Sequence, residues 1–133
     1  MPNVLSVMRK EIKKIAHNAT VRDASRRMKE DRIGSLLVEK AGSLVGIVTD
    51  TDIVRRGVAD ANDLNKLTVE DIMTSPIVTI EGVRTVQDAH DMMGDLHVRH
   101  LGVTEGSSIV GVVSVRDLLV YFKRVSEPKI TQD

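Results

Sequence analysis

The sequence contains no cysteine, no tryptophan, one phenylalanine and one tyrosine in 133 residues. The lack of cysteine excludes disulfides, thiolate metal sites, iron–sulfur clusters and a cysteine nucleophile. Few aromatic residues and a net charge of zero argue against nucleic-acid binding, which uses a basic face and stacking rings. No stretch approaches the ~20 apolar residues that span a bilayer, and no signal-peptide pattern opens the chain. We therefore expect a soluble, cytoplasmic protein that makes no membrane contact.

An internal repeat is the main feature that the sequence does contain. Shifted by 65 residues, segment 20–54 aligns with segment 85–119 without a gap, and 12 of the 35 positions are identical. The chain is thus a tandem duplication, long enough to bury roughly two-thirds of the surface that its unfolded form exposes. We expect repeat 1 at 1–57, a linker at 58–71, repeat 2 at 72–124 and a polar tail at 125–133.

Each repeat predicts the element order β-α-β-β-α. A short apolar stretch, 12–16 or 77–80, precedes a Thr-x-x-Asp capping box that marks the start of a helix. Two apolar runs follow, separated by a polar Gly/Ser turn, which is the spacing of a β-hairpin. The second hairpin strand, 44–48 or 109–113, is apolar on both faces and leads into another helix, so we expect it to be buried on both sides. The linker contains a short turn at 68–73.

The duplicated unit resembles a pair of CBS domains, the small regulatory modules named after cystathionine β-synthase. Its landmarks are the segment 69–76 (VEDIMTSP), a Gly-h-h-Thr/Ser-x-x-Asp motif that ends at Asp52 and at Asp117, and the segment 97–101 (HVRHL). The resemblance covers residues 4–123. It implies an α+β fold in which two β-α-β-β-α repeats pack about a pseudo-two-fold axis and leave two equivalent clefts. In that family the clefts commonly bind adenine nucleotides or related adenosyl compounds, and two pairs often form a disc-like homodimer.

The Thr/Ser-x-x-Asp pairs carry the predicted ligand contacts. Asp52 and Asp117 hold short carboxylates that can accept hydrogen bonds from both hydroxyls of a ribose. Thr49 and Ser114 stand where a buried strand opens into a helix, so we expect their hydroxyls to point towards a phosphate. An alternative stays open, because Ser/Thr-x-x-Asp occurs five times in the chain and the pattern alone is a helix cap.

The strand before each pair adds an apolar contact and a glycine. Ile47 and Val112 lie two residues before the hydroxyl and therefore on the same strand face, where we expect them to border an adenine ring. Gly46 and Gly111 lie within the same strands, where a missing side chain lets another backbone or a ligand approach closely.

A basic pair distinguishes the two repeats. Arg99 and His100 precede the first hairpin strand of repeat 2, where the resembled family often places groups that reach nucleotide phosphates. Repeat 1 has Gly34 and Ser35 at these positions, so we expect the tighter anionic site in repeat 2. The alternative is an exposed arginine and a surface histidine, and no cluster of ligands predicts a metal site. Other basic residues are further candidates for either cleft: Arg9, Lys10, Arg32, Arg55 and Arg56.

The sequence therefore predicts a regulatory sensor and not an enzyme, since it has no P-loop, nucleophile elbow or metal quartet. We expect it to bind AMP, ADP or ATP, with S-adenosylmethionine or NAD as alternative ligands, and to require no cofactor. Occupancy is expected to act on a regulated protein partner or on the chain's own homodimer. The rival hypothesis is a ligand-free dimerisation or docking module for an enzyme or transporter. A contact of the basic segment 9–32 with a partner or with nucleic acid is a third hypothesis.

Overall fold

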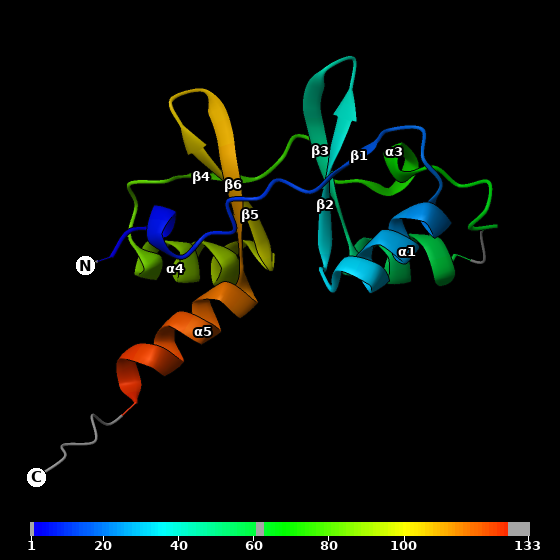
Figure 1. The fold of residues 1–133 in the computed structure, drawn as a ribbon. Coiled ribbons are helices and arrows are strands. Elements are labelled where there is room, and N and C mark those ends of the chain that lie inside the picture. The colour runs from blue at the N-terminus through cyan, green and yellow to red at the C-terminus, as the bar shows by residue number, and fades with distance from the viewer. Residues whose placement is uncertain (1, 61–62, 128–133) are drawn as a thin grey trace, which may run out of the picture. The chain divides into compact units, whose positions relative to one another are not determined.

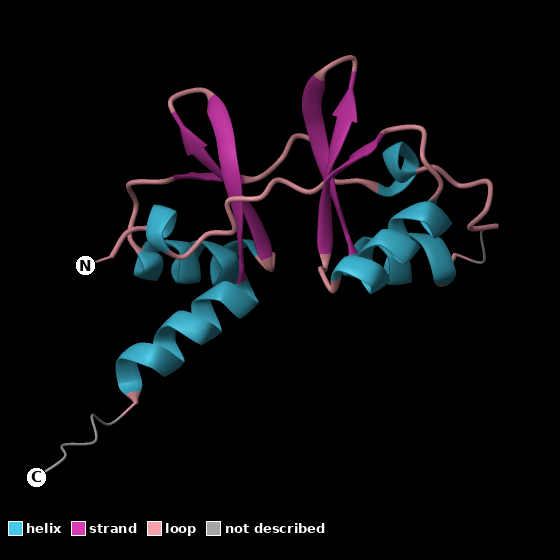
Figure 2. Ribbon diagram, in the orientation of Figure 1, coloured by secondary structure: helices cyan, strands magenta, loops and turns pink. Residues whose placement is uncertain are grey.

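The computed structural model describes residues 2–60 and 63–127 and has the duplicated α+β architecture that the sequence predicts (Figures 1 and 2). Each repeat supplies one three-stranded sheet, in the order β1-β2-β3 or β4-β5-β6. In both sheets the first strand runs parallel to the second, and the second pairs antiparallel with the third through a hairpin. The predicted tandem β-α-β-β-α arrangement is therefore confirmed.

The elements follow one another in the same order in both halves. The first half contains η1 (Val4–Ser6), β1 (Lys14–Ala16), α1 (Val21–Asp31), β2 (Ser35–Lys40), β3 (Ser43–Thr49), α2 (Asp50–Asp52) and the π-helical turn η2 (Ile53–Val58). The second half contains α3 (Val69–Ile72), β4 (Thr79–Glu81), α4 (Val86–Leu96), β5 (His100–Glu105), β6 (Ser108–Ser114) and α5 (Val115–Ser126).

Two predicted boundaries differ from the observed ones. The helix expected over 50–57 consists of one α-helical turn followed by a wider π-helical turn that ends at Val58. Helix α5 continues to Ser126, so the expected polar tail at 125–133 begins inside a helix, and residues 128–133 lie outside the described part of the chain. Among the described helices, none is long and apolar enough to cross a membrane.

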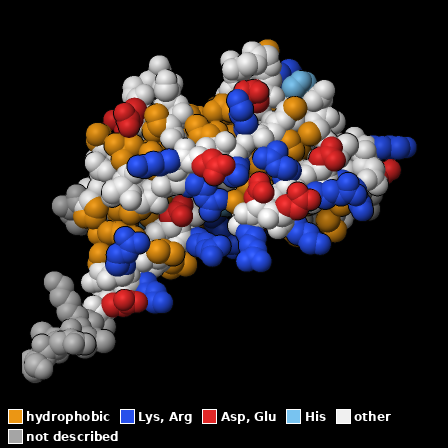
Figure 3. Space-filling model, in the orientation of Figure 1, with side chains coloured by type: hydrophobic (Ala, Val, Ile, Leu, Met, Phe, Trp, Pro, Cys, Tyr) orange, Lys and Arg blue, Asp and Glu red, His pale blue; other side chains and the backbone are white. Residues whose placement is uncertain are grey.

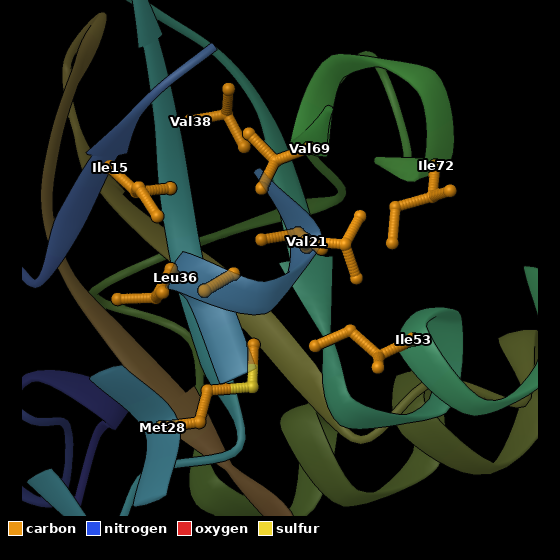
Figure 4. Packing of buried hydrophobic residues seen from close by; sticks show 10 residues of the cluster. Ile15, Val21, Met28, Leu36, Val38, Ile53, Val69 and Ile72 are labelled. Carbon is orange, nitrogen blue, oxygen red and sulfur yellow. The ribbon is translucent and has the colours of Figure 1, made fainter. Parts of the chain in front are cut away.

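The core beside the first sheet joins one face of α1 to alternate residues of the strands (Figure 4). Val21 and Met28 project from α1, as their helical spacing predicts, and meet Leu36 and Val38 of β2. Val69 at the start of α3 completes this cluster and is fully buried. The corresponding face of α4 is also buried, since it carries the same apolar spacing.

Burial of the second hairpin strands follows the prediction in part. In β3, the central residues Gly46, Ile47 and Val48 are buried, but in β6 only Gly111 and Val113 are, and Val112 is half-buried. The first two apolar residues of each strand are half-buried as well. The ends of the hairpins thus project beyond the packed part of each sheet (Figure 2).

Packing divides the chain differently from the sequence repeat. One compact unit comprises residues 12–78, here called the first-sheet unit, and the other comprises 1–11 with 79–133, called the second-sheet unit. The segment before β1 therefore packs on the sheet of the second repeat, and the segment before β4 packs on the sheet of the first. We call residues 3–11 the N-terminal arm and residues 68–76 the central arm. The compact units therefore differ from the sequence repeats, because each unit includes the arm that precedes the other unit's first strand.

The two arms begin with equivalent contacts. The amide of Val4 donates to the carbonyl of Arg84 at 2.8 Å, and the amide of Val69, 65 residues later, donates to the carbonyl of Ala19 at 2.9 Å. Both valines are fully buried. The 65-residue shift that aligns the sequence therefore also relates these tertiary contacts.

Each arm then pairs with the free edge of a hairpin strand. Arg9 and Val112 exchange two backbone hydrogen bonds of 2.8 and 3.1 Å, and Thr74 and Ile47 exchange two of 2.9 and 3.0 Å. The strands β3 and β6, which end their sheets in the strand order, are thereby covered at these points by an arm.

Candidate ligand-binding site

The first candidate site lies at the junction of β3 and α2. Thr49 ends the strand and caps the helix: its Oγ1 accepts from the amide of Asp52 at 3.2 Å, and Asp52 Oδ2 accepts from the amide of Thr49 at 3.0 Å. Asp52 is 9% exposed, which makes it a buried carboxylate held by a local capping box. The sequence brings the two residues together because a capping box needs three-residue spacing.

The second candidate site repeats this geometry at the junction of β6 and α5. Asp117 Oδ2 accepts from the amide of Ser114 at 2.8 Å and from its hydroxyl at 3.0 Å, and Ser114 Oγ accepts from the amide of Asp117 at 3.2 Å. Asp117 is half-buried, so it is more open to solvent than its counterpart Asp52. In both sites the capping bonds go to Oδ2, and a carboxylate has roughly four acceptor positions, which leaves capacity for a ribose hydroxyl.

The capping interpretation of the motif holds throughout the chain. All five Ser/Thr-x-x-Asp pairs form capping boxes, including the two at the candidate sites. The pattern alone therefore does not identify a ligand site. What sets these two apart is their place at the end of a hairpin strand, directly opposite the first residue of its partner strand.

The strand register brings the predicted residues of repeat 2 together. His100 lies directly opposite Ser114, and the amide of Val115 donates to the carbonyl of Arg99 at 2.9 Å. Arg99, His100, Ser114 and Asp117 therefore meet at one end of the second sheet. This proximity matches the expectation, whereas their role in binding a ligand stays a prediction.

Repeat 1 has the same arrangement with uncharged residues. Ser35 lies opposite Thr49, and the amide of Asp50 donates to the carbonyl of Gly34 at 3.0 Å. The end of the first sheet thus lacks the basic pair, as the sequence alignment of the repeats indicates.

The candidate residues share the sheet face that points away from the helical core. Leu36 and Val48 belong to the core cluster beside α1, and side chains alternate along a strand, so Ile47 and Thr49 point to the opposite face. The same alternation in β6 places Val112 on one face with Ser114. Exposure differs between the sites, because Ile47 is buried whereas Val112 is half-buried and Arg99 is exposed.

The two strand glycines contact the arms. A Cβ atom added to Gly111 would lie 2.6 Å from the carbonyl oxygen of Arg9 and 2.7 Å from the sulfur of Met8. At Gly46 the added atom would lie 2.8 Å from the carbonyl oxygen of Thr74. The close approach that these glycines predict is therefore an approach of protein backbone.

Sequence reasoning did not identify the residues that the arms bring to the sites. The sequence leaves Arg9 as one of five basic candidates with no assigned cleft, and it indicates no separate role for Thr74. The structure places Arg9 beside Val112 and Thr74 beside Ile47. The 65-residue shift makes positions 9 and 74 equivalent, and this equivalence is the sequence signal for their similar roles. It does not indicate on which sheet each arm packs.

The basic segment 9–32 carries charges of both signs in the structure. Lys14 Nζ pairs with Glu39 at 2.8 Å, and Arg27 Nε lies 3.6 Å from Asp31. Basic and acidic side chains are interspersed on the visible face in Figure 3. Within residues 2–60 and 63–127, no group of three or more His, Cys, Asp or Glu side chains is arranged to hold a metal ion.

Comparison with known proteins identifies the same duplication. The family model described as CBS domain matches residues 4–59 and 69–124. The CBS domain-containing protein YhcV of Bacillus subtilis is 28% identical over 120 residues, which cover 90% of this chain and 85% of YhcV. The chain spans between 51% and 67% of the length of four other curated relatives.

Solved structures have the same fold. A putative signal-transduction protein with CBS domains from Burkholderia ambifaria is 28% identical, with a TM-score of 0.87 and 96% of each chain covered. A hexameric CBS-CP12 protein from bloom-forming cyanobacteria is 31% identical, with a TM-score of 0.84, and the match covers 96% of this chain and 76% of that one.

Proposed function

The chain belongs to the CBS-domain family, and from that membership we propose that it is a regulatory sensor that binds adenosyl nucleotides of the AMP, ADP or ATP class. Tandem CBS proteins generally act as regulatory or sensor modules, and stand-alone members are generally not catalytic. The observation that carries the nucleotide proposal is the backbone pairing at one end of the second sheet, which brings Arg99 and His100 to the strand end where the Ser114 hydroxyl meets the Asp117 carboxylate.

Each residue of the second-sheet site has a proposed role. Asp117 accepts hydrogen bonds from the ribose hydroxyls, and Ser114 donates its hydroxyl to a phosphate, away from the carboxylate that it caps in the free protein. Val112, half-buried on the same strand face, borders the adenine ring. Arg99 and His100 contact the phosphates, for which a guanidinium is well matched.

The first-sheet site has the same ribose and base contacts but no basic pair. Asp52 and Thr49 are proposed to hold the ribose and Ile47 to border the base. Gly34 and Ser35 replace the cations, so this site is proposed to favour ligands with less negative charge, S-adenosylmethionine among them. NAD is an alternative ligand for either site.

Binding can regulate the protein only by favouring one arrangement of its parts over another. The ligand can shift the equilibrium between two arrangements by no more than the difference between its binding free energies for them. The proposed output is a change in a protein partner or in the chain's own homodimer. CBS domains commonly oligomerise, and the CBS-CP12 neighbour is hexameric.

A thermal-shift screen tests the nucleotide proposal. AMP, ADP, ATP, S-adenosylmethionine and NAD are compared with GTP, all at the same concentration. A ligand at a hundredfold excess over its dissociation constant stabilises the fold by about 2.7 kcal/mol, which raises the melting temperature by several degrees in a protein of this size, and a weaker ligand at the same concentration raises it less. We expect the shift with adenosyl compounds and a smaller shift with GTP.

A pair of matched variants tests whether the nucleotide binds at the second-sheet site. Asp117→Ala and Asp88→Ala both remove the carboxylate of a capping box, but only Asp117 belongs to the proposed site. The two variants should lose similar stability without ligand, about 1 kcal/mol. Only Asp117→Ala should reduce the nucleotide shift. A wild-type protein that no adenosyl compound stabilises would refute the sensor proposal.

A ligand-free assembly module is the second candidate function, and one feature of α5 favours it. This helix exposes Leu119, Val120 and Val125, at 64%, 50% and 58% of their surfaces. Exposed apolar side chains on one helix are typical of a contact between proteins. Sedimentation of the wild type and of Leu119→Ser should show whether the chain forms a homodimer through α5.

A further inference from the structure

The N-terminal arm brings a cation to the second-sheet site that the first-sheet site lacks. Arg9 is the residue of this arm that pairs with Val112, through two backbone hydrogen bonds of 2.8 and 3.1 Å. In the first-sheet unit, the equivalent pair is Thr74 with Ile47. The two arms therefore pair with their strands in the same way. They differ in charge at the residue beside the proposed base contact, which is Arg9 in one arm and Thr74 in the other.

The strand geometry places Arg9 on the candidate face of the sheet. Directly opposed residues of an antiparallel pair have their side chains on the same face, so Arg9 shares a face with Val112. Alternation along β6 places Ser114 on that face too, and the same rule across β5 adds its opposed residue His100. Arg9 is exposed, so its guanidinium is not enclosed in the helical core.

The backbone of Arg9 is held firmly against the strand. Besides the two hydrogen bonds, its carbonyl oxygen lies 2.6 Å from the position that a Cβ atom at Gly111 would take. The buried Val4 anchors the arm five residues earlier. Because the arm is attached at both places, the position from which the Arg9 side chain extends is set by the unit and not by a free terminus.

The basic residues flank β6 from its two edges. Arg9 lies on the arm edge, and His100 lies on β5 at the other edge, with Arg99 immediately before it. Arg9 and His100 are separated by two strand spacings, roughly 10 Å, and by two residues along the strand, about 7 Å. The long side chain of Arg9 from one edge and the imidazole of His100 from the other can therefore approach one phosphorylated ligand over the face that holds Ser114.

We propose that Arg9 is a phosphate-binding residue of the second-sheet site and makes that site selective for adenine nucleotides with two or three phosphates. The inference rests on the proposed function and deepens it. At the positions of Arg9, Arg99 and His100, the first-sheet unit has Thr74, Gly34 and Ser35, none of which is charged. The two sites are therefore proposed to differ in their preference for the number of phosphates on the ligand. The charge on the arm residue, Arg9 or Thr74, contributes to this difference.

The test compares adenosine, AMP, ADP and ATP by isothermal titration calorimetry. Arg9→Thr installs the residue found at the equivalent position, so the backbone pairing of the arm is preserved. A hydrogen bond to a charged group corresponds to about tenfold to a hundredfold in affinity. We expect Arg9→Thr to weaken ATP binding by that factor and to leave adenosine binding within about twofold. The salt dependence of ATP binding should fall as well.

Two further variants make the result independent of folding defects. Lys123→Thr removes an exposed cation from the last turn of α5 in the same unit and should leave the ATP to adenosine ratio unchanged. Thr74→Arg transfers the cation to the first-sheet unit and should increase ATP affinity there, read in an Asp117→Ala background that weakens the other site.

The outcomes separate this inference from the proposal on which it rests. Adenosine binding with an ATP preference that Arg9→Thr does not change would overturn the role of Arg9 alone, as would a Thr74→Arg variant without a gain. A wild-type chain that binds none of the four compounds would overturn both. Loss of the ATP preference in Arg9→Thr, with the melting temperature of the free protein unchanged, supports the assignment.

Discussion

At the scale of single residues, two glycines decide how closely the arms approach the sheets. Gly46 and Gly111 occupy equivalent places in β3 and β6, and at both an added Cβ would meet an arm carbonyl oxygen within 3 Å. A backbone oxygen cannot turn aside as a flexible side chain can. By contrast, a Cβ at Gly94, within α4, would meet nothing within 4 Å.

This contrast predicts opposite effects of the same substitution. Gly111→Ala should lower the free energy of unfolding by about 1–3 kcal/mol, because the arm has to shift and its hydrogen bonds with Val112 weaken. Gly94→Ala should raise it by roughly 0.5–1 kcal/mol, because alanine favours a helix. Urea unfolding measures both values. Equal stabilities for the two variants would contradict the close contact between the N-terminal arm and β6.

At the scale of elements, the two arms are attached by different chemistry. Glu70 of the central arm pairs through Oε2 with Nδ1 of His17 and through Oε1 with Nζ of Lys40, each at 2.7 Å. At the positions equivalent to Glu70 and His17, the N-terminal arm has Leu5 packed against Gly82. One arm is therefore held partly by an ion pair with Lys40 and a hydrogen bond with His17, and the other by apolar contact.

The Glu70 carboxylate makes the central arm sensitive to acid. Hydrogen bonds from Lys40 and then from His17 hold the pKa of Glu70 below its ordinary value of 4.5. A carboxylate with a lowered folded-state pKa stabilises the protein above its unfolded-state pKa, and this contribution is lost as pH falls through the folded-state value. The charged contacts are exposed, so salt also weakens them.

Comparison of Glu70→Gln with the wild type tests this dependence. The variant should be less stable at pH 5, and the difference should shrink as the pH is lowered towards 3, since the wild-type carboxylate is progressively protonated as the pH falls below the unfolded-state pKa. Thermal unfolding across this range measures it. Glu105→Gln, at the position equivalent to Lys40, serves as the control. A difference between Glu70→Gln and the wild type that stays constant down to pH 3 would show that Glu70 does not act through its charge.

At the scale of the whole molecule, each compact unit depends on a segment from the other sequence repeat. The N-terminal arm completes the second-sheet unit, and the central arm completes the first-sheet unit. Val4 and Val69, both fully buried, are the equivalent anchors. A substitution in the N-terminal arm should therefore lower the stability of the second sheet, β4-β5-β6.

Amide hydrogen exchange can detect the dependence of each sheet on the arm from the other repeat. Val4→Ala should cost about 1.5–3 kcal/mol and speed amide exchange in β5 and β6, although residue 4 precedes the first repeat's own strands. Val69→Ala should instead speed exchange in β2 and β3. Val83→Ala, at a position that is 69% exposed, should change neither. Faster exchange in β2 and β3 after Val4→Ala would contradict the exchanged arms.

Local sequence signals predicted the elements well because the interactions that form them are local. A capping box joins residues three apart, and a helix face or hairpin turn is encoded within one segment, so the starts of α1 at Thr20 and of α4 at Thr85 were predictable. The predictions were less accurate where tertiary contacts intervene. The helix after Thr49 changes to a wider turn at Ile53, and Val112 is less buried than its apolar neighbours suggest.

The candidate site shows the same division between local and long-range information. The sequence indicated the pairs Thr49 with Asp52 and Ser114 with Asp117, and the strand register brought Arg99 and His100 to the second pair as expected. It could not select Arg9 among five cations. That selection depends on which sheet edge receives the N-terminal arm.

Three features thus follow from the sequence alone: the duplication, the order of elements and the equivalence of positions 65 residues apart. Each depends only on local residue patterns or on the similarity of the chain to itself. The tertiary structure decided which arm packs on which sheet and, through the pairing of Arg9 with Val112, which side chains share a face. Self-similarity identifies equivalent residues but not their partners, because an arm can close onto its own repeat or the other one with the same local pattern. Only the packed chain distinguishes the two.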